Sequence, residues 1–194
     1  MKTCRTVTIP KLLCLAVVAT FSHPPVGAAE VDAPAGVRLA DGALQLTPPA
    51  AWTAKKPKFA GIIDYEFSVP AAEGDTTGAR VVIGGAGGGI EANQQRWLRQ
   101  FTQPDGARTA DRAERSEQTI AGTAVTTLDV SGTYNAPPFD PGGGGARPNY
   151  RLRVAVINAG PRGAYYVKLY GPRKTVAAAE DAFDGMIDSL RVGR

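Results

Sequence analysis

The feature that most restricts the fold is an alternation of apolar and polar residues that recurs in short segments joined by turns. Residues 62–69 (IIDYEFSV) show it most clearly, and the pattern returns in residues 126–131, 151–156 and 165–170. A period of two places successive side chains on opposite faces of a β-strand. Because short turns connect neighbouring segments, the strands should pair antiparallel. We therefore predict a mainly antiparallel sheet of about six to eight strands.

Turn residues mark the connections between these strands. Asp41-Gly42 separates residues 37–40 from residues 43–46 and predicts a tight hairpin, because this dipeptide readily adopts positive φ angles. Ala121-Gly122 predicts a second hairpin, and residues 158–163 (NAGPRG) form a turn before the last long strand. Residues 79–83 (ARVVI) are a further strand, and residues 108–118 are expected to be a charged loop leading into one.

Two segments have helical periodicity instead. Apolar residues fall on one stripe over residues 90–101 and again, more clearly, over residues 176–190. The stripes are formed by Ile90, Trp97, Leu98 and Phe101, and by Val176, Ala179, Phe183, Met186, Ile187 and Leu190. The predicted fold class is therefore α+β, with two amphipathic helices that cover a sheet face.

Within the predicted strand of residues 62–69, the side chain of Ile63 is expected to lie on the same face as those of Tyr65, Phe67 and Val69.

The first 28 residues are typical of a signal peptide. Lys2, Arg5 and Lys11 form a basic start without acids, the apolar run of residues 12–21 is too short to span a membrane, and small residues precede Ala29. We predict export to the periplasm or beyond, with no transmembrane helix in the mature chain. Residues 29–36 are then a flexible lead-in, and residues 37–194 are one domain.

Removal of residues 1–28 excludes several kinds of chemistry. Cys4, Cys14 and His23 all lie in this segment, so the mature chain has no cysteine or histidine for a disulfide, a thiol nucleophile or a Ser-His-Asp triad. The charge balance becomes 19 Lys+Arg against 18 Asp+Glu, so the net charge falls from +4 to +1. A nearly neutral domain has no field to attract nucleic acid, and we predict none as a partner.

Neither the acidic residues nor the glycine cluster carries a specific motif. Residues 84–89 (GGAGGG) do not complete G-x-G-x-x-G or a P-loop, so we favour a close-packed or flexible connection over anion binding. No calcium loop or carboxylate pair marks a cleft, which disfavours Asp64, Glu66 and Asp129 as hydrolase residues and Asp105, Asp111 and Asp140 as calcium ligands. We predict no catalytic residue, no metal site and no cofactor.

The polar side of the last two long strands is a candidate ligand site. If these strands pair across residues 158–163, Arg153 lies opposite Lys168, and Arg151 lies opposite Tyr170. Adjacent cations need an anion between them. One interpretation is a solvated, salt-bridged face; the other is a small-ligand or anion-binding site. The residues of that second interpretation are Arg151, Arg153, Lys168, Tyr166 and Tyr170.

A second candidate is the segment of residues 134–149 (YNAPPFDPGGGGARPN). Its prolines and glycines predict a long surface loop, and long loops in compact domains are either functional or mobile. Tyr134, Phe139 and Arg147 are the side chains that would contact a partner if this is a binding loop.

Three strings also suggest a family. They are residues 65–75 (YEFSVPAAEGD), 85–106 (GAGGGIEANQQRWLRQFTQPDG) and 165–190 (YYVKLYGPRKTVAAAEDAFDGMIDSL). They resemble a family of small, uncharacterised bacterial secreted proteins, and their layout is similar to the wider PsbP-like group. This resemblance implies an antiparallel sheet flanked by helices and an accessory, assembly or binding role without enzyme chemistry.

The leading hypothesis is a non-enzymatic extracytoplasmic accessory or binding protein whose partner is an unknown protein or envelope component. The alternative is a small-ligand or anion-binding module on the basic and aromatic sheet face.

Overall fold

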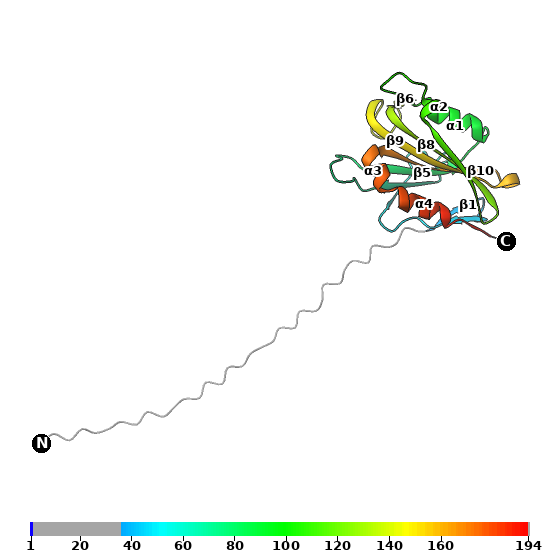
Figure 1. Ribbon diagram of the computed structural model, residues 1–194. Coiled ribbons are helices and arrows are strands. Elements are labelled where there is room, and N and C mark those ends of the chain that lie inside the picture. Colours follow the sequence, from blue (N-terminus) through cyan, green and yellow to red (C-terminus); the bar gives the residue numbers. More distant parts are fainter. Residues whose placement is uncertain (2–35, 194) are drawn as a thin grey trace. The chain divides into compact units, whose positions relative to one another are not determined.

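The computed structural model describes residue 1 and residues 36–193 of the chain (Figure 1). The chain divides into two units, and residues 36–193 all belong to the second, compact one. Apart from residues 1 and 36, the predicted signal peptide and lead-in lie outside the described residues and remain predictions. Everything below concerns the second unit.

The main element of this unit is an eight-stranded sheet in which every pairing is antiparallel. The strand order is β3-β4-β5-β10-β9-β8-β6, and β7 also pairs with β8. The strands are β3 (Thr53–Lys55), β4 (Tyr65–Val69), β5 (Ala79–Gly85), β6 (Phe101–Thr102), β7 (Glu114–Ile120), β8 (Thr123–Ala136), β9 (Gly145–Asn158) and β10 (Ala164–Pro172). A small second sheet contains β1 (Val37–Leu39), β2 (Leu44–Leu46) and β11 (Arg191–Val192). The predicted α+β class and the number of strands are confirmed.

The predicted hairpins are present. Leu39 pairs with Leu44, so the first hairpin turns over four residues, 40–43, rather than over Asp41-Gly42 alone, with positive φ at Ala40, Asp41 and Gly42. Ile120 pairs with Thr123 across Ala121-Gly122, again with positive φ at both central residues, as this turn type requires. A short 3-10 turn, η1 (Gly160–Arg162), connects β9 to β10.

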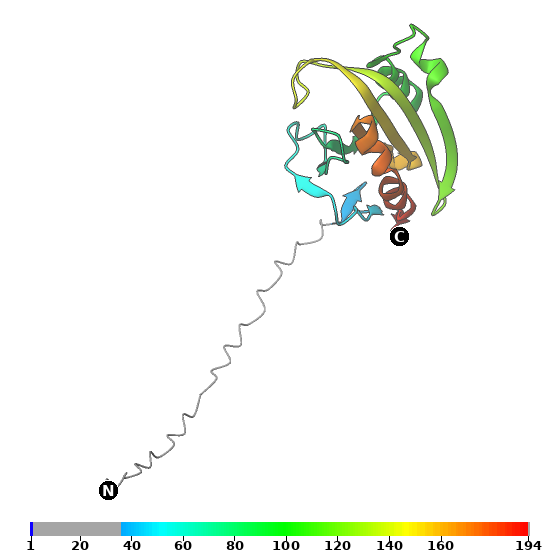
Figure 2. The same ribbon diagram turned by 60° about the vertical axis from the view of Figure 1, so that its left-hand side comes forward.

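The C-terminal helices cover one face of the sheet (Figure 2). The apolar stripe predicted over residues 176–190 is buried throughout, but it lies on two short helices, α3 (Arg173–Ala178) and α4 (Glu180–Asp188). Ala179, at φ −96° and ψ 0°, separates them. Their side chains pack with those of β1 and β2 against the central strands, so the central part of this face is covered.

The first helix covers the opposite face, contrary to the prediction that both helices lie on one. Helix α1 (Ile90–Leu98) buries Trp97 and Leu98 against a separate core cluster that contains Val82 and Tyr166. The helix also ends earlier than predicted, because Phe101 belongs to β6. Helix α1 covers only part of this face, and the site described below lies beside it.

Three boundaries also differ from the predictions. Strand β4 begins at Tyr65 rather than at Ile62, and a turn before it sends Ile63 to the α1 side, away from Phe67. The expected charged loop contains helix α2 (Thr109–Arg112) and most of the exposed strand β7. The loop expected at residues 134–149 is reduced to residues 137–144, because β8 and β9 extend into it from both sides and pair as far as Ala136 and Gly145.

Candidate functional site: a lysine-floored apolar pocket

The register of β9 and β10 separates the residues predicted to form one basic and aromatic face. Lys168 pairs with Val154, and Arg153 pairs with Leu169, so the predicted pairing is wrong by one residue. Since side chains alternate between faces, this shift moves a whole set of side chains to the other side of the sheet. The structure therefore does not bring the five predicted ligand residues together: Arg151 and Arg153 lie on the α3–α4 face, and Tyr166, Lys168 and Tyr170 lie on the α1 face.

The two arginines form a closed ion-pair network, as the salt-bridged interpretation expects. Arg151 donates to both carboxylate oxygens of Asp129, at 2.8 and 2.6 Å, and to Glu180 at 2.7 Å. Arg153 donates to Asp129 at 2.8 Å and in a fork to Asp184. This network joins the sheet to α4 and leaves no cation available for an added anion.

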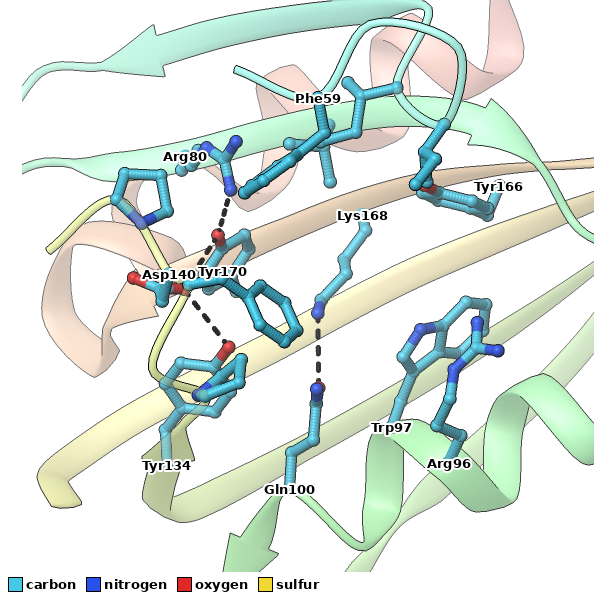
Figure 3. Close-up of a pocket in the computed structure, with 16 residues that line it drawn as sticks. Phe59, Arg80, Arg96, Trp97, Gln100, Tyr134, Asp140, Tyr166, Lys168 and Tyr170 are labelled. Atoms are coloured by element: carbon cyan, nitrogen blue, oxygen red, sulfur yellow. Dashed lines mark hydrogen bonds between the residues drawn. The ribbon is translucent and has the colours of Figure 1, made fainter. Parts of the chain in front are cut away.

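A pocket of about 450 Å³ lies on the opposite face (Figure 3). Strands β5 and β10 form its floor with Arg80, Val82, Tyr166, Lys168 and Tyr170. Its wall comes from α1 and the residues just after it, and its mouth from residues 59–63 and the tip of the β8–β9 hairpin. The wall and mouth residues are Arg96, Trp97, Gln100, Tyr134, Phe59, Ile62, Ile63, Pro137, Phe139, Asp140 and Pro141.

Lys168 lies at the centre of this floor and points into the pocket (Figure 3). Only 8% of the residue is exposed, and the only hydrogen bond of its Nζ within the described chain is a long one of 3.4 Å to Oε1 of Gln100. The ammonium also lies 4.6 Å from the ring centre of Tyr170, a cation–π distance. An ammonium group has three donors, so most of its hydrogen-bonding capacity is unused.

Burial lowers the pKa of Lys168 to about 8 from the ordinary 10.5. Asp140 partly opposes this shift, whereas Arg80 and Arg96 lower the pKa further. The lysine is thus still mainly protonated at neutral pH, but its charge is poorly stabilised by the protein.

The other charged groups around the pocket differ in how far they are neutralised. Arg80 forms a two-bonded pair with Glu66, at 2.7 and 2.8 Å, and also donates to the Tyr170 hydroxyl. Asp140 pairs with Arg147 at 2.9 Å. Within residues 36–193 no carboxylate lies within salt-bridge distance of Lys168 or Arg96. The pocket therefore holds two cations in excess over its acids.

Asp140 also anchors the hairpin tip over the pocket. Its carboxylate accepts hydrogen bonds from the hydroxyls of Tyr134 and Tyr170, both at 3.3 Å. Burial raises the pKa of Tyr170 to about 12, so its hydroxyl stays protonated at physiological pH and can donate to Asp140. Of the three residues predicted to contact a partner, Tyr134 is buried and Arg147 is held by Asp140, which leaves Phe139. Phe139 is 64% exposed and packs edge-on against Phe59, with ring centres 5.9 Å apart.

The glycine cluster contributes one close-packed position to the site. A Cβ on Gly84 would lie 2.5 Å from the carbonyl oxygen of Ile62 and 3.1 Å from the Tyr166 hydroxyl. Nδ2 of Asn93 donates to the carbonyls of Gly87 and Gly89 at 2.8 and 2.7 Å, which ties the glycine segment to the first turn of α1.

The acidic residues considered as hydrolase candidates do not form a cleft. Asp64 is exposed, Glu66 is paired with Arg80, and Asp129 belongs to the network on the other face. Among residues 36–193 no cluster of three or more His, Cys, Asp or Glu side chains is arranged to hold a metal ion. Nor does this part of the chain contain a helix long and apolar enough to cross a membrane.

Sequence reasoning identified the floor residues Tyr166, Lys168 and Tyr170. It named Tyr134 and Phe139 only as partner contacts of a loop, and it missed the other wall and mouth residues. One signal was available: Lys168 interrupts the otherwise apolar and aromatic run of residues 164–172 (AYYVKLYGP). Trp97, Gln100, Phe59 and Ile62 are distant in sequence, and only the fold brings them together.

No family model matches the chain, and no curated protein matches it. Several solved structures do. LpqN of Mycobacterium tuberculosis, which is involved in cell envelope biogenesis, is 14% identical over 82% of this chain and 90% of that chain, with a TM-score of 0.49. A cyanobacterial PsbP from Synechocystis is also 14% identical, over 90% of this chain and 99% of that chain, with a TM-score of 0.48.

The Ran-binding protein Mog1p of Saccharomyces cerevisiae is 13% identical over 81% of this chain and 94% of that chain, with a TM-score of 0.44. All of these similarities concern the arrangement of sheet and helices. One of them is a PsbP, a member of the group that the sequence resembles. None of these similarities assigns a function to this chain.

Proposed function

We propose that this protein is a binding protein for a small molecule that combines an anionic group with an apolar body. The observation that carries the proposal is Lys168, a buried cation with one weak hydrogen bond at the floor of an apolar pocket. Small-molecule sites are typically apolar clefts of this size with a few polar groups that orient the ligand. The proposal keeps the alternative hypothesis from the sequence but places the site on one face of the sheet only.

Charge complementarity supports an anion over a neutral ligand. Asp140 and Glu66 are each neutralised by an arginine, whereas Lys168 and Arg96 have no carboxylate partner within residues 36–193. A ligand carboxylate beside Lys168 would form a charge-assisted hydrogen bond in a site shielded from water, where such bonds are strongest. Trp97, Val82 and Tyr166 then offer apolar surface to the rest of the ligand.

Binding in the cell envelope fits the predicted signal peptide, and export to the periplasm or beyond remains part of the proposal. Of the three residues that the hypothesis of a protein or envelope partner named, only Phe139 is exposed and not held in an ion pair. We regard the pocket as the better supported site because it holds a buried cation without a carboxylate partner within residues 36–193, which the hairpin tip lacks.

Calorimetric titration of residues 29–194 with octanoate and with 1-octanol at pH 7 tests the proposal. These two probes share a chain and differ in head group. We expect octanoate to bind at least tenfold more tightly, since a hydrogen bond to a charged group contributes about 1.5–3 kcal/mol. Lys168→Met should abolish that preference, and Lys174→Met, which removes an exposed lysine of α3, should preserve it. Equal binding of both probes, or a preference that survives Lys168→Met, would overturn the proposal.

A further inference from the structure

The mouth of the pocket carries an unusual share of the exposed apolar surface. Three large apolar side chains are exposed within residues 36–193, namely Ile62 at 69%, Phe139 at 64% and Val192 at 38%. Ile62 and Phe139 both line the pocket, whereas Val192 lies on β11, outside it. Apolar side chains that line a cavity and also face solvent mark the place where its interior opens to water.

The buried lysine and the two exposed apolar side chains lie at different depths of this pocket. Lys168 is buried on the sheet, and the hydroxyls of Tyr134 and Tyr170 are tied to Asp140. The buried Trp97, the half-buried Phe59 and the exposed Ile62 and Phe139 line the same pocket. A compact aromatic acid held at Lys168 would leave the two mouth residues in water, whereas an extended chain would cover them.

We infer that the ligand class is a carboxylate with an extended acyl chain, whose head group lies at Lys168 and whose tail leaves the pocket over Ile62 and Phe139. This inference rests on the proposed function, because it specifies the body of the ligand that the pocket would hold. Covering exposed apolar surface supplies the driving force, since each methylene that is removed from water contributes up to about fourfold in affinity.

A chain-length series tests this inference. Dissociation constants are measured by calorimetry for hexanoate, octanoate, decanoate and dodecanoate, below the concentrations at which these acids self-associate. The wild-type protein should bind dodecanoate at least about tenfold more tightly than octanoate. In the double variant Ile62→Ser, Phe139→Ser this gain should fall to about threefold or less, while hexanoate affinity stays within about twofold of wild type.

Val192→Ser is the matched control, because it removes another exposed apolar side chain outside the pocket. It should leave the whole series unchanged. All three positions are exposed, so the variants should keep the wild-type melting temperature within about 2 °C.

The outcomes separate this inference from the proposed function. If affinity stops rising at hexanoate or octanoate, or if the mouth variant keeps the full gain, the ligand is compact and the inference is wrong while the anion site stands. In that case Ile62 and Phe139 contact a different partner. If no member of the series binds better than its matching alcohol, the proposed function fails, and the inference fails with it.

Discussion

The cations on the two faces of the sheet differ in how many carboxylate partners they have. On the α3–α4 face, Arg151 and Arg153 share Asp129 and reach Glu180 and Asp184. On the α1 face, Lys168 is just as close to the centre of the sheet but has only a 3.4 Å hydrogen bond to Gln100. All three residues come from the neighbouring strands β9 and β10, so the difference arises from what packs above each face.

The comparison shows how a structural charge differs from a charge that serves binding. A buried cation surrounded by carboxylates stabilises a particular packing, and removing it leaves those carboxylates unpaired. A buried cation without a counter-charge raises the free energy of the folded protein until a ligand supplies one. Replacing one cation on each face by methionine should therefore have opposite effects on stability.

The largest effect is expected on the α3–α4 face. Arg153→Met removes a guanidinium that donates to both Asp129 and Asp184, and we expect the free energy of unfolding to fall by about 3 kcal/mol, because Asp184 loses this partner while Asp129 keeps its pair with Arg151. Urea denaturation followed by circular dichroism measures this change. A loss below about 1 kcal/mol would show that the network is a solvated surface pair rather than a buried one.

The matched change on the other face should stabilise the protein in the absence of ligand. Lys168→Met removes a group whose pKa is lowered by burial to about 8, and a shift of this size corresponds to about 3 kcal/mol. The folded state binds this proton less readily than the unfolded state does, so the cost is fully present below pH 8 and disappears between pH 8 and pH 10.5.

We therefore expect Lys168→Met to raise the free energy of unfolding at pH 7 by about 2–3 kcal/mol. The advantage over wild type should shrink as the pH rises through that window. Denaturation curves of both proteins at pH 7 and pH 10 provide the check. A destabilised variant at pH 7 would mean that Lys168 is held by the protein itself, and the contrast between the faces would disappear.

Gly84→Ala tests how tightly the mouth segment lies against the floor. The added Cβ would meet the Ile62 carbonyl oxygen at 2.5 Å, so we expect a loss of about 2 kcal/mol in stability and a displaced pocket mouth. Gly87→Ala is the control, because its Cβ would meet no atom within 4 Å. Similar melting temperatures for the two variants would show that residues 59–63 are not fixed over the floor.

The smallest effect concerns the anchor of the hairpin tip. Tyr134→Phe removes one of the two hydroxyls that donate to Asp140, and we expect a loss of about 1 kcal/mol. Proteolysis within residues 137–144 should become faster, because the tip is then held by fewer bonds. An unchanged proteolysis rate would show that the hairpin tip is held mainly by the ion pair of Arg147 with Asp140 and by the contact between Phe59 and Phe139.

The sequence allowed the fold class to be predicted because the strands and their turns are local features. The alternation in residues 165–170 and the Asp41-Gly42 and Ala121-Gly122 turns each specify structure within a few residues. Tyr166, Lys168 and Tyr170 were recognised for the same reason, as alternate residues of one strand.

The arrangement of the site was not predictable in this way. The face on which Arg153 lies relative to Lys168 depends on a register set by the length of the turn at residues 158–163, and a shift of one residue reverses it. The extension of β8 and β9 into the glycine-rich segment depends on their pairing with each other. The position of α1 depends on the burial of Trp97 against Tyr166, a contact between residues far apart in the chain.

The central claim is that Lys168 is a buried cation that lacks its counter-charge until a ligand binds. The most direct test is an NMR titration of the ¹³Cε resonance of Lys168, assigned by its absence from the Lys168→Met spectrum, with and without saturating octanoate. We expect a midpoint near pH 8 in the free protein and a higher midpoint with octanoate, because a bound carboxylate stabilises the ammonium. A midpoint near 10.5 in the free protein, or one that octanoate leaves unchanged, would contradict the claim.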